Sequence, residues 1–153
     1  MAKLLEKRGA TPFQAPSLQE VPYEANTDAI AFGEVLLAGR CSCLIVMTGV
    51  GTKILIEAMA TKWPKDEILE ALSQTTIISR GPKPVATLKT YKLKAKLVAN
   101  APNTWQDVVE LLDNHWPIQD KTIHIQEYGA RNQDFLDALN SRQANIQPIP
   151  IYG

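Results

Sequence analysis

Residues 43 to 48 (CLIVMT) are the segment that most restricts what this chain can fold into. The run contains no charged residue, and its apolar side chains are consecutive rather than alternating with polar ones. A consecutive apolar run of strand length is typical of a strand buried on both faces, as in a parallel sheet covered by helices. The chain must therefore supply helices for both sides of such a sheet.

Extended and helical patterns alternate along the rest of the chain. We expect four further strands, at residues 75–79, 93–99, 121–126 and 145–152. We expect helices at residues 27–38, 52–59, 64–72, 83–90, 105–114 and 132–142. Strands that alternate with helices imply right-handed parallel crossovers. The sequence therefore predicts an α/β fold, a flavodoxin-like three-layer sandwich with a five-stranded parallel sheet.

Composition and charge exclude several classes of protein. The 16 Lys and Arg residues equal the 16 Asp and Glu residues in number, which argues against a general nucleic-acid-binding protein. No apolar run reaches the length of a membrane span, and charged residues interrupt the opening segment where a secretory signal would lie. We expect a cytoplasmic protein. Cys41 and Cys43 are two residues apart, so we interpret them as packing residues rather than as a disulfide or a zinc site.

The loops that follow the carboxyl ends of the strands are the expected ligand site of such a sheet. Here they are residues 48–51, 79–84, 100–104 and 126–132, and most of them contain glycine. Glycine lets the backbone approach a ligand closely, and helix starts offer unpaired N–H groups to carboxylates or phosphates. The loops predict a general anion site, and this alone does not select one ligand.

The standard catalytic and nucleotide-binding motifs are missing. The segment TGVGTK, residues 48–53, is too short for a phosphate loop and lacks the third glycine of a dinucleotide fingerprint. The first buried strand ends in Met47 and Thr48 rather than in magnesium-binding carboxylates, and no G-x-S-x-G elbow occurs. His124 lies between two isoleucines, and we expect it in the core or on a sheet face.

The segments that carry a family resemblance follow one another over nearly the whole chain. They are APSLQEVPY, MTGVGTKILIEAM, ISRGPKPVATLKTYKLKA, PNTWQDVVELL and KTIHIQEYGARNQDFLDALNSRQANIQPIPIYG. In this order and spacing the chain resembles the uroporphyrinogen-III synthase family, particularly bacterial members with GVG and GPKP turns. The resemblance implies two similar α/β domains joined by a two-stranded ladder, with one domain built from both chain ends.

On that resemblance, the chain represents one complete domain and part of another. Residues 25–147 are expected to form the inserted flavodoxin-like domain. Residues 17–24 and 148–153 are expected to be the two linker strands, and residues 1–16 a remnant of the split first domain.

The resemblance also implies a reaction, the cyclisation of hydroxymethylbilane to uroporphyrinogen III with inversion of one pyrrole ring and loss of water. The implied enzyme is a lyase of tetrapyrrole and heme biosynthesis. It is expected to need no metal or organic cofactor and to be a monomer in its full-length form. Tyr152 is the expected catalytic acid. The expected substrate contacts are Thr48, Gly49, Gly51, Gly81, Lys83, Pro84, Tyr128 and Gly129.

Two departures from the family pattern reduce the expected side-chain contacts. Gly49 stands where many relatives have serine, and Pro84 stands where they have threonine, so hydroxyl contacts are lost at both positions. Two other functions remain open from the sequence: an inactive single-domain fragment, and a flavodoxin-like module that binds a small anion.

Overall fold

The computed structural model of the chain describes residues 26–128 and 132–151. In chain order its strands are β1 (Cys43–Val46), β2 (Thr76–Ser79), β3 (Leu97–Val98), β4 (Thr122–Tyr128) and β5 (Asn145–Ile151). Its helices are α1 (Thr27–Leu37), α2 (Gly49–Met59), α3 (Lys65–Ser73), α4 (Pro82–Thr90), α5 (Trp105–His115) and α6 (Gln133–Asn140). The predicted alternation of strands and helices is confirmed.

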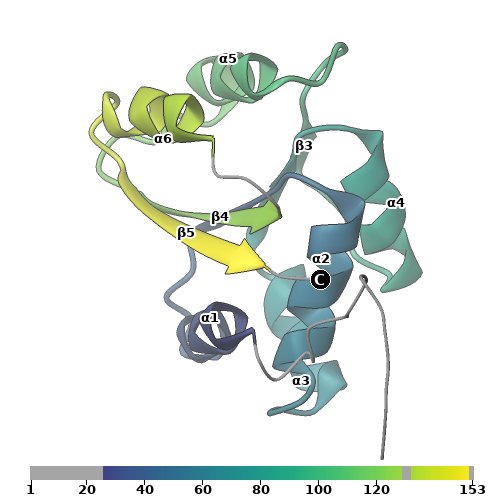
Figure 1. Cartoon of the computed structure of the whole chain (residues 1–153). Helices are drawn as coiled ribbons and strands as arrows, with labels where there is room; N and C mark the ends of the chain where they lie inside the picture. The colour runs from purple at the N-terminus through teal and green to yellow at the C-terminus, as the bar shows by residue number, and fades with distance from the viewer. Residues whose placement is uncertain (1–25, 129–131, 152–153) are drawn as a thin grey trace, which may run out of the picture.

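The five strands form one parallel sheet in the order β3-β2-β1-β4-β5. Helices α1 to α4 cover one face of this sheet, and α5 and α6 cover the other (Figure 1). The three-layer α/β class and the five parallel strands are therefore confirmed. The order differs from the flavodoxin order 2-1-3-4-5. The switch point, where the strand order reverses, lies between β1 and β4. The sequence had not specified the strand order.

Several boundaries differ from the predictions, most of them by one or two residues, and a long-range contact explains one of the differences. The Gly49–Gly51 segment, expected as a turn, is the first turn of α2, because Thr48 caps the helix there. Residues 127 and 128, also expected as a turn, extend β4 because β5 pairs with it along its whole length. The strand expected at residues 93–99 shortens to Leu97–Val98, and the first strand ends at Val46 rather than Thr48.

Strand β5 lies at an edge of the sheet although it contains Pro148 and Pro150. Proline lacks an N–H group, and an edge strand tolerates it when that side faces away from the ladder. Residues 148–151, which were predicted to begin the return linker, are the second half of β5 and pair with β4. The predicted remnant (1–16) and first linker strand (17–24) lie outside the described residues.

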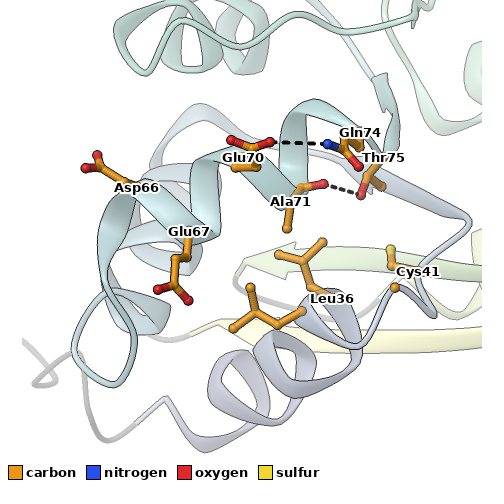
Figure 2. Close-up of a pocket in the computed structure, with 10 residues that line it drawn as sticks. Leu36, Cys41, Asp66, Glu67, Glu70, Ala71, Gln74 and Thr75 are labelled. Carbon is orange, nitrogen blue, oxygen red and sulfur yellow. Dashed lines mark hydrogen bonds between the residues drawn. The ribbon is translucent and has the colours of Figure 1, made fainter.

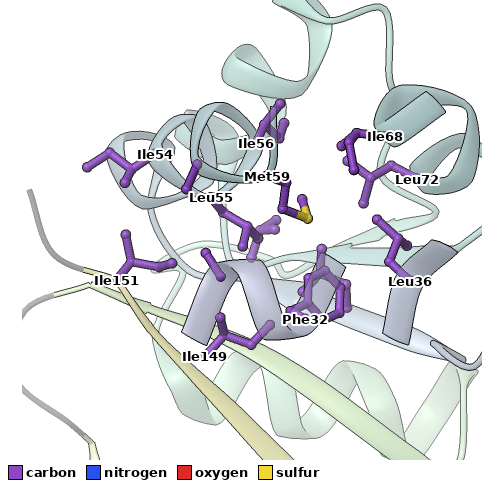
Figure 3. Close-up of a cluster of buried hydrophobic side chains, with 14 of the residues drawn as sticks. Phe32, Leu36, Ile54, Leu55, Ile56, Met59, Ile68, Leu72, Ile149 and Ile151 are labelled. Carbon is purple, nitrogen blue, oxygen red and sulfur yellow. The ribbon is translucent and has the colours of Figure 1, made fainter. Parts of the chain in front are cut away.

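The larger hydrophobic core lies between the sheet and helices α1 to α4. Figure 3 shows side chains of α1 and α2 between those of α3 (Ile68 and Leu72) and those of β5 (Ile149 and Ile151). The second core packs α5 and α6 on the opposite face and includes Phe135, which is 2% exposed. Two buried faces explain why the residues of β1 are apolar without alternation.

The polar groups predicted to be packing residues are indeed inside the protein. His124 is 6% exposed, and its ring lies 5.0 Å from the ring of Phe32, centroid to centroid. Cys43 is buried and Cys41 is half-buried, both with free thiols. Burial raises the pKa of Cys41 to about 12, so its thiol is unreactive at neutral pH. Within the described part of the chain, no helix is both long and apolar enough to cross a membrane.

Gly33 of α1 packs against Trp63, which lies in the segment that leads into α3. A Cβ atom at this position would overlap the indole ring of Trp63. We predict that Gly33→Ala lowers the free energy of unfolding by about 1–3 kcal/mol, although alanine favours a helix by about 1 kcal/mol. In a Trp63→Ala background the same change should stabilise the protein. Urea denaturation of the four proteins measures both effects, and destabilisation by Gly33→Ala in both backgrounds would contradict the packing argument.

Burial of His124 makes stability depend on pH in a defined window. Desolvation lowers the pKa of His124 from its ordinary 6.5, so below that pH the unfolded chain binds a proton that the folded chain resists. The free energy of unfolding should therefore fall as the pH drops below 6.5, by at most about 1.4 kcal/mol per pH unit. We expect His124→Phe to flatten this fall in urea denaturation between pH 5 and 7.5. His115→Gln, at an exposed position on α5, should leave the fall in the free energy of unfolding unchanged.

Candidate functional site

The strands end at one edge of the sheet, and the residues that follow them form the carboxyl edge: 47–49, 80–82, 99–104 and 132. A cavity of about 360 Å³ opens at this edge, beside the switch point between β1 and β4. Ligands of open parallel sheets bind at such a point. We call it the carboxyl-edge cavity, and it is lined by Met47, Thr48, Arg80, Thr104, Trp105, Ile125, Glu127, Asn132 and Phe135.

Gln126 holds the turn between β1 and α2 in place from the neighbouring strand. Its side-chain Oε1 accepts hydrogen bonds from the backbone N–H groups of Met47, at 3.1 Å, and Thr48, at 3.2 Å. The residue is fully buried, and its Nε2 has no partner among the described residues. An unpaired buried donor costs about 1–3 kcal/mol. Such an exception in a native core requires an explanation.

Arg80 joins three of the carboxyl-edge loops. Its Nε donates to the backbone oxygen of Met47 at 2.9 Å, and its Nη1 donates to the backbone oxygen of Asn103 at 2.8 Å. Its Nη2 makes no hydrogen bond to the part of the chain that the structure describes, and Arg80 lines the cavity. The guanidinium is therefore fixed in position with donor capacity left for an anion.

The amino ends of α2 and α4 carry the least compensated positive dipoles at this edge, since neither has an acidic residue in its first turn. The helices α5 and α6 each have an acidic residue in the first turn, Asp107 and Asp134, and α2 has none. Hydrogen bonds from the backbone and side chain of Thr104 lower the pKa of Asp107, which keeps that carboxylate charged at the start of α5. Helix geometry leaves the first amides of α2 without an intrahelical acceptor. The first turn of α4 contains Pro82 and Pro84, which have no N–H group, so the start of α2 is the better anion-binding position.

The predicted glycine contacts Gly49, Gly51 and Gly81 lie against protein rather than open space. A Cβ atom at Gly49 would be 2.8 Å from Thr87 Oγ1, and one at Gly81 would be 3.1 Å from the Asn103 side chain. A Cβ at Gly51 would overlap the amide of Gln126. The absence of side chains at these positions lets the loops of the carboxyl edge pack closely together. The amide of Gly51 is also occupied, since it donates to Thr48 Oγ1 at 2.9 Å.

The other predicted residues are divided between the cavity, the surface and unplaced positions. Thr48 caps α2 and lines the cavity, Lys83 is exposed in the first turn of α4, and Pro84 is buried. Tyr128 is the last residue of β4 and pairs with Ile151 at the end of β5. Gly129 and Tyr152 lie outside the described residues.

Sequence reasoning missed most residues of the cavity. Arg80 lay in a loop that was predicted to matter but was not selected, and its position directly after a buried strand was an available signal. Gln126 reaches Thr48 across 78 residues, and no local pattern reveals such a contact. No sequence motif singles out Trp105 and Phe135, whose ring centroids are 6.1 Å apart. They form an aromatic wall of the cavity.

A larger groove, of about 620 Å³, lies at the opposite edge of the sheet, between α1 and α3. Figure 2 shows Leu36 and Ala71 between the two helices, with Asp66, Glu67 and Glu70 along α3. The acidic side chains of this groove repel anions, and the groove is remote from the carboxyl ends of the strands. Within residues 26–128 and 132–151, no group of three His, Cys, Asp or Glu residues could hold a metal ion.

Two solved structures resemble the chain over most of its length. Crystal structures of uroporphyrinogen III synthase from the extremely thermophilic bacterium Thermus thermophilus superpose with TM-scores of 0.69 for a mutant and 0.66 for the wild type. Both are 26% identical in sequence, and the match covers 96% of this chain and 54% of the Thermus chain. The likeness therefore extends to about half of the solved proteins.

A curated relative and a family model agree with that likeness. The Uncharacterized protein YjjA of Bacillus subtilis (strain 168) is 24% identical over 152 residues, which are 99% of this chain and 55% of YjjA. The chain thus spans about half the length of the relatives it matches. The model described as uroporphyrinogen-III synthase HemD matches residues 1–153. Because that match includes every residue, the chain belongs to the uroporphyrinogen-III synthase family.

Proposed function

We propose that the chain forms one lobe of a uroporphyrinogen-III synthase, which closes hydroxymethylbilane to uroporphyrinogen III with inversion of one pyrrole ring and loss of water. The observation that carries the proposal is the carboxyl-edge cavity, where Arg80 and the uncompensated start of α2 offer donors beside an aromatic wall. The substrate is a chain of pyrroles with acidic arms, so it needs both kinds of surface.

The carboxylate arms are assigned to the polar side of the cavity. The free amides of Gly49 and Val50 and the Nη2 of Arg80 bind them, and the exposed ammonium of Lys83 attracts them from the neighbouring helix. Gly51, Gly81 and Pro84 act through packing, because they are buried against protein. This divides the predicted contact residues into ligand-binding and supporting groups.

The pyrrole rings are assigned to Trp105, which packs against the buried ring of Phe135. A cavity of about 360 Å³ lies at the lower end of the volumes of ligand sites, so it accommodates part of a linear tetrapyrrole. The remaining rings contact the other lobe, which corresponds to the half of the relatives that this chain does not cover. Two lobes that hold both ends of one molecule bring the reacting carbons together, and this positioning supplies much of the catalysis.

The chemistry of closure asks little else of the protein. Loss of the hydroxyl group as water produces an azafulvene, driven by the pyrrole electrons, and the terminal pyrrole then attacks it through a spiro intermediate. Tyr152 is proposed as the acidic group that donates a hydrogen bond to the leaving hydroxyl without being ionised, since a phenol has an ordinary pKa near 10. The proton that completes the water comes from the pyrrole N–H, whose loss gives the azafulvene. Tyr152 directly follows Ile151, whose partner Tyr128 ends β4 at the carboxyl edge. Tyr128 and Gly129 are proposed as contacts on the same grounds.

A chimera tests the proposed function. Residues 1–153 replace the matching half of the Thermus thermophilus synthase, and the folded product is incubated with hydroxymethylbilane made in situ. We expect chromatography to show mainly the type III isomer. The spontaneous reaction gives type I, so the isomer formed distinguishes enzymatic from spontaneous closure. A chimera that is folded by circular dichroism but yields only type I would contradict the proposal. In that case, binding of a small anion by the chain alone would support the anion-module reading instead.

The role of Arg80 is measured in the same chimera. Arg80→Met removes a positioned charge, and we expect KM to rise by about tenfold or more, since hydrogen bonds to charged groups contribute about 1.5–3 kcal/mol. Arg40→Met, at an exposed position before β1, is the matched control and should leave KM unchanged. An equal effect of the two substitutions would show that Arg80 acts only through overall charge.

A further inference from the structure

Gln126 places a neutral acceptor directly behind the anion site. Two N–H groups point at one side-chain oxygen, from Met47 at 3.1 Å and from Thr48 at 3.2 Å, so the amide can be oriented in only one way. The hydroxyl group of Thr52 also lies within hydrogen-bond distance of this oxygen, at 3.4 Å from Oγ1 to Oε1. Gln126 therefore determines the orientation of the peptide units that lead into the free amides of α2.

The same contacts connect Gln126 to Arg80. The peptide unit between Met47 and Thr48 makes both contacts: its N–H, on Thr48, donates to Gln126 Oε1 at 3.2 Å, and its oxygen, on Met47, accepts from Arg80 Nε at 2.9 Å. Both anion-binding groups, the start of α2 and the guanidinium, thus depend on one buried side chain. Gly51 is coupled to it as well, because a side chain at that position would displace the amide.

The orphan Nε2 indicates what the position requires. A glutamate would accept the same two N–H groups on one oxygen, and its second carboxylate oxygen would take the place of the unpaired Nε2. A glutamate would also place a negative charge beneath the start of α2, which has no acidic residue in its own first turn. The amide keeps the acceptor and avoids the charge, at the cost of a buried N–H without a partner among the described residues.

We propose that Gln126 is a positioning residue for carboxylate binding, kept neutral so that the Met47–Thr48 turn is held without weakening the positive potential at the start of α2. This inference rests on the proposed function, since it assumes a ligand with several carboxylates. It assigns to Gln126 an effect on affinity that is separate from its effect on stability.

The test compares three variants of the 153-residue chain. Gln126→Glu keeps the acceptor and adds a charge, Gln126→Met loses the acceptor, and Gln119→Glu adds the same charge at an exposed position before β4. The thermal midpoint is measured for each, together with the Kd for uroporphyrin III, an octacarboxylate tetrapyrrole, by quenching of tryptophan fluorescence.

We expect Gln126→Glu to weaken binding by about tenfold, from charge repulsion at short range, and also to lower the midpoint, because a buried carboxylate costs more than a buried amide. Gln126→Met should lower the midpoint by about 5 °C or more, and Gln119→Glu should change neither quantity. Parent-like affinity of a folded Gln126→Glu chain would overturn the role of Gln126 and leave the proposed function intact. Failure of the parent chain to bind uroporphyrin III would overturn the proposed lobe, and the inference with it.

Discussion

The parallel pairing of β1 with β2 on one side and with β4 on the other determines where every group of the site lies. Because the strands run in one direction, residues that follow them meet at one edge although they are far apart in sequence. Helices cover both faces of the sheet, and a cavity opens at the carboxyl ends of β1 and β4, where the strand order reverses. The apolar run that forms β1 is therefore the basis of the site as well as of the core.

Polar contacts at the carboxyl edge are unusually dependent on two side chains. Arg80 connects Met47 with Asn103, and Gln126 connects β4 with the start of α2. Around them, glycines remove side chains where loops pack against one another. A rigid frame of this kind suits a reaction in which the protein mainly orients a substrate that supplies its own electrons.

The sequence predicted the elements of the fold better than the members of the site. Apolar runs and helix caps are local signals, and they located β1, β2 and α5 closely. The length of β4 depends on pairing with β5, so the end of β4 was misplaced. The start of α2 was misplaced although its Thr48 cap is a local signal, because the Gly49–Gly51 segment was interpreted as a loop. Glycine in the loops was interpreted as room for a ligand, whereas the neighbours of Gly49, Gly51 and Gly81 are protein. Contacts that span tens of residues, such as those of Gln126, leave no local pattern.

The central claim is that anions bind at the carboxyl edge of this sheet. Backbone amide shifts of the ¹⁵N-labelled chain, followed by NMR during titration with the monopyrrole porphobilinogen, test it residue by residue. The account predicts saturable shifts at Gly49, Val50 and Trp105, with small changes at the amino edge. Shifts confined to the groove between α1 and α3, around Leu37 and Glu70, would contradict it.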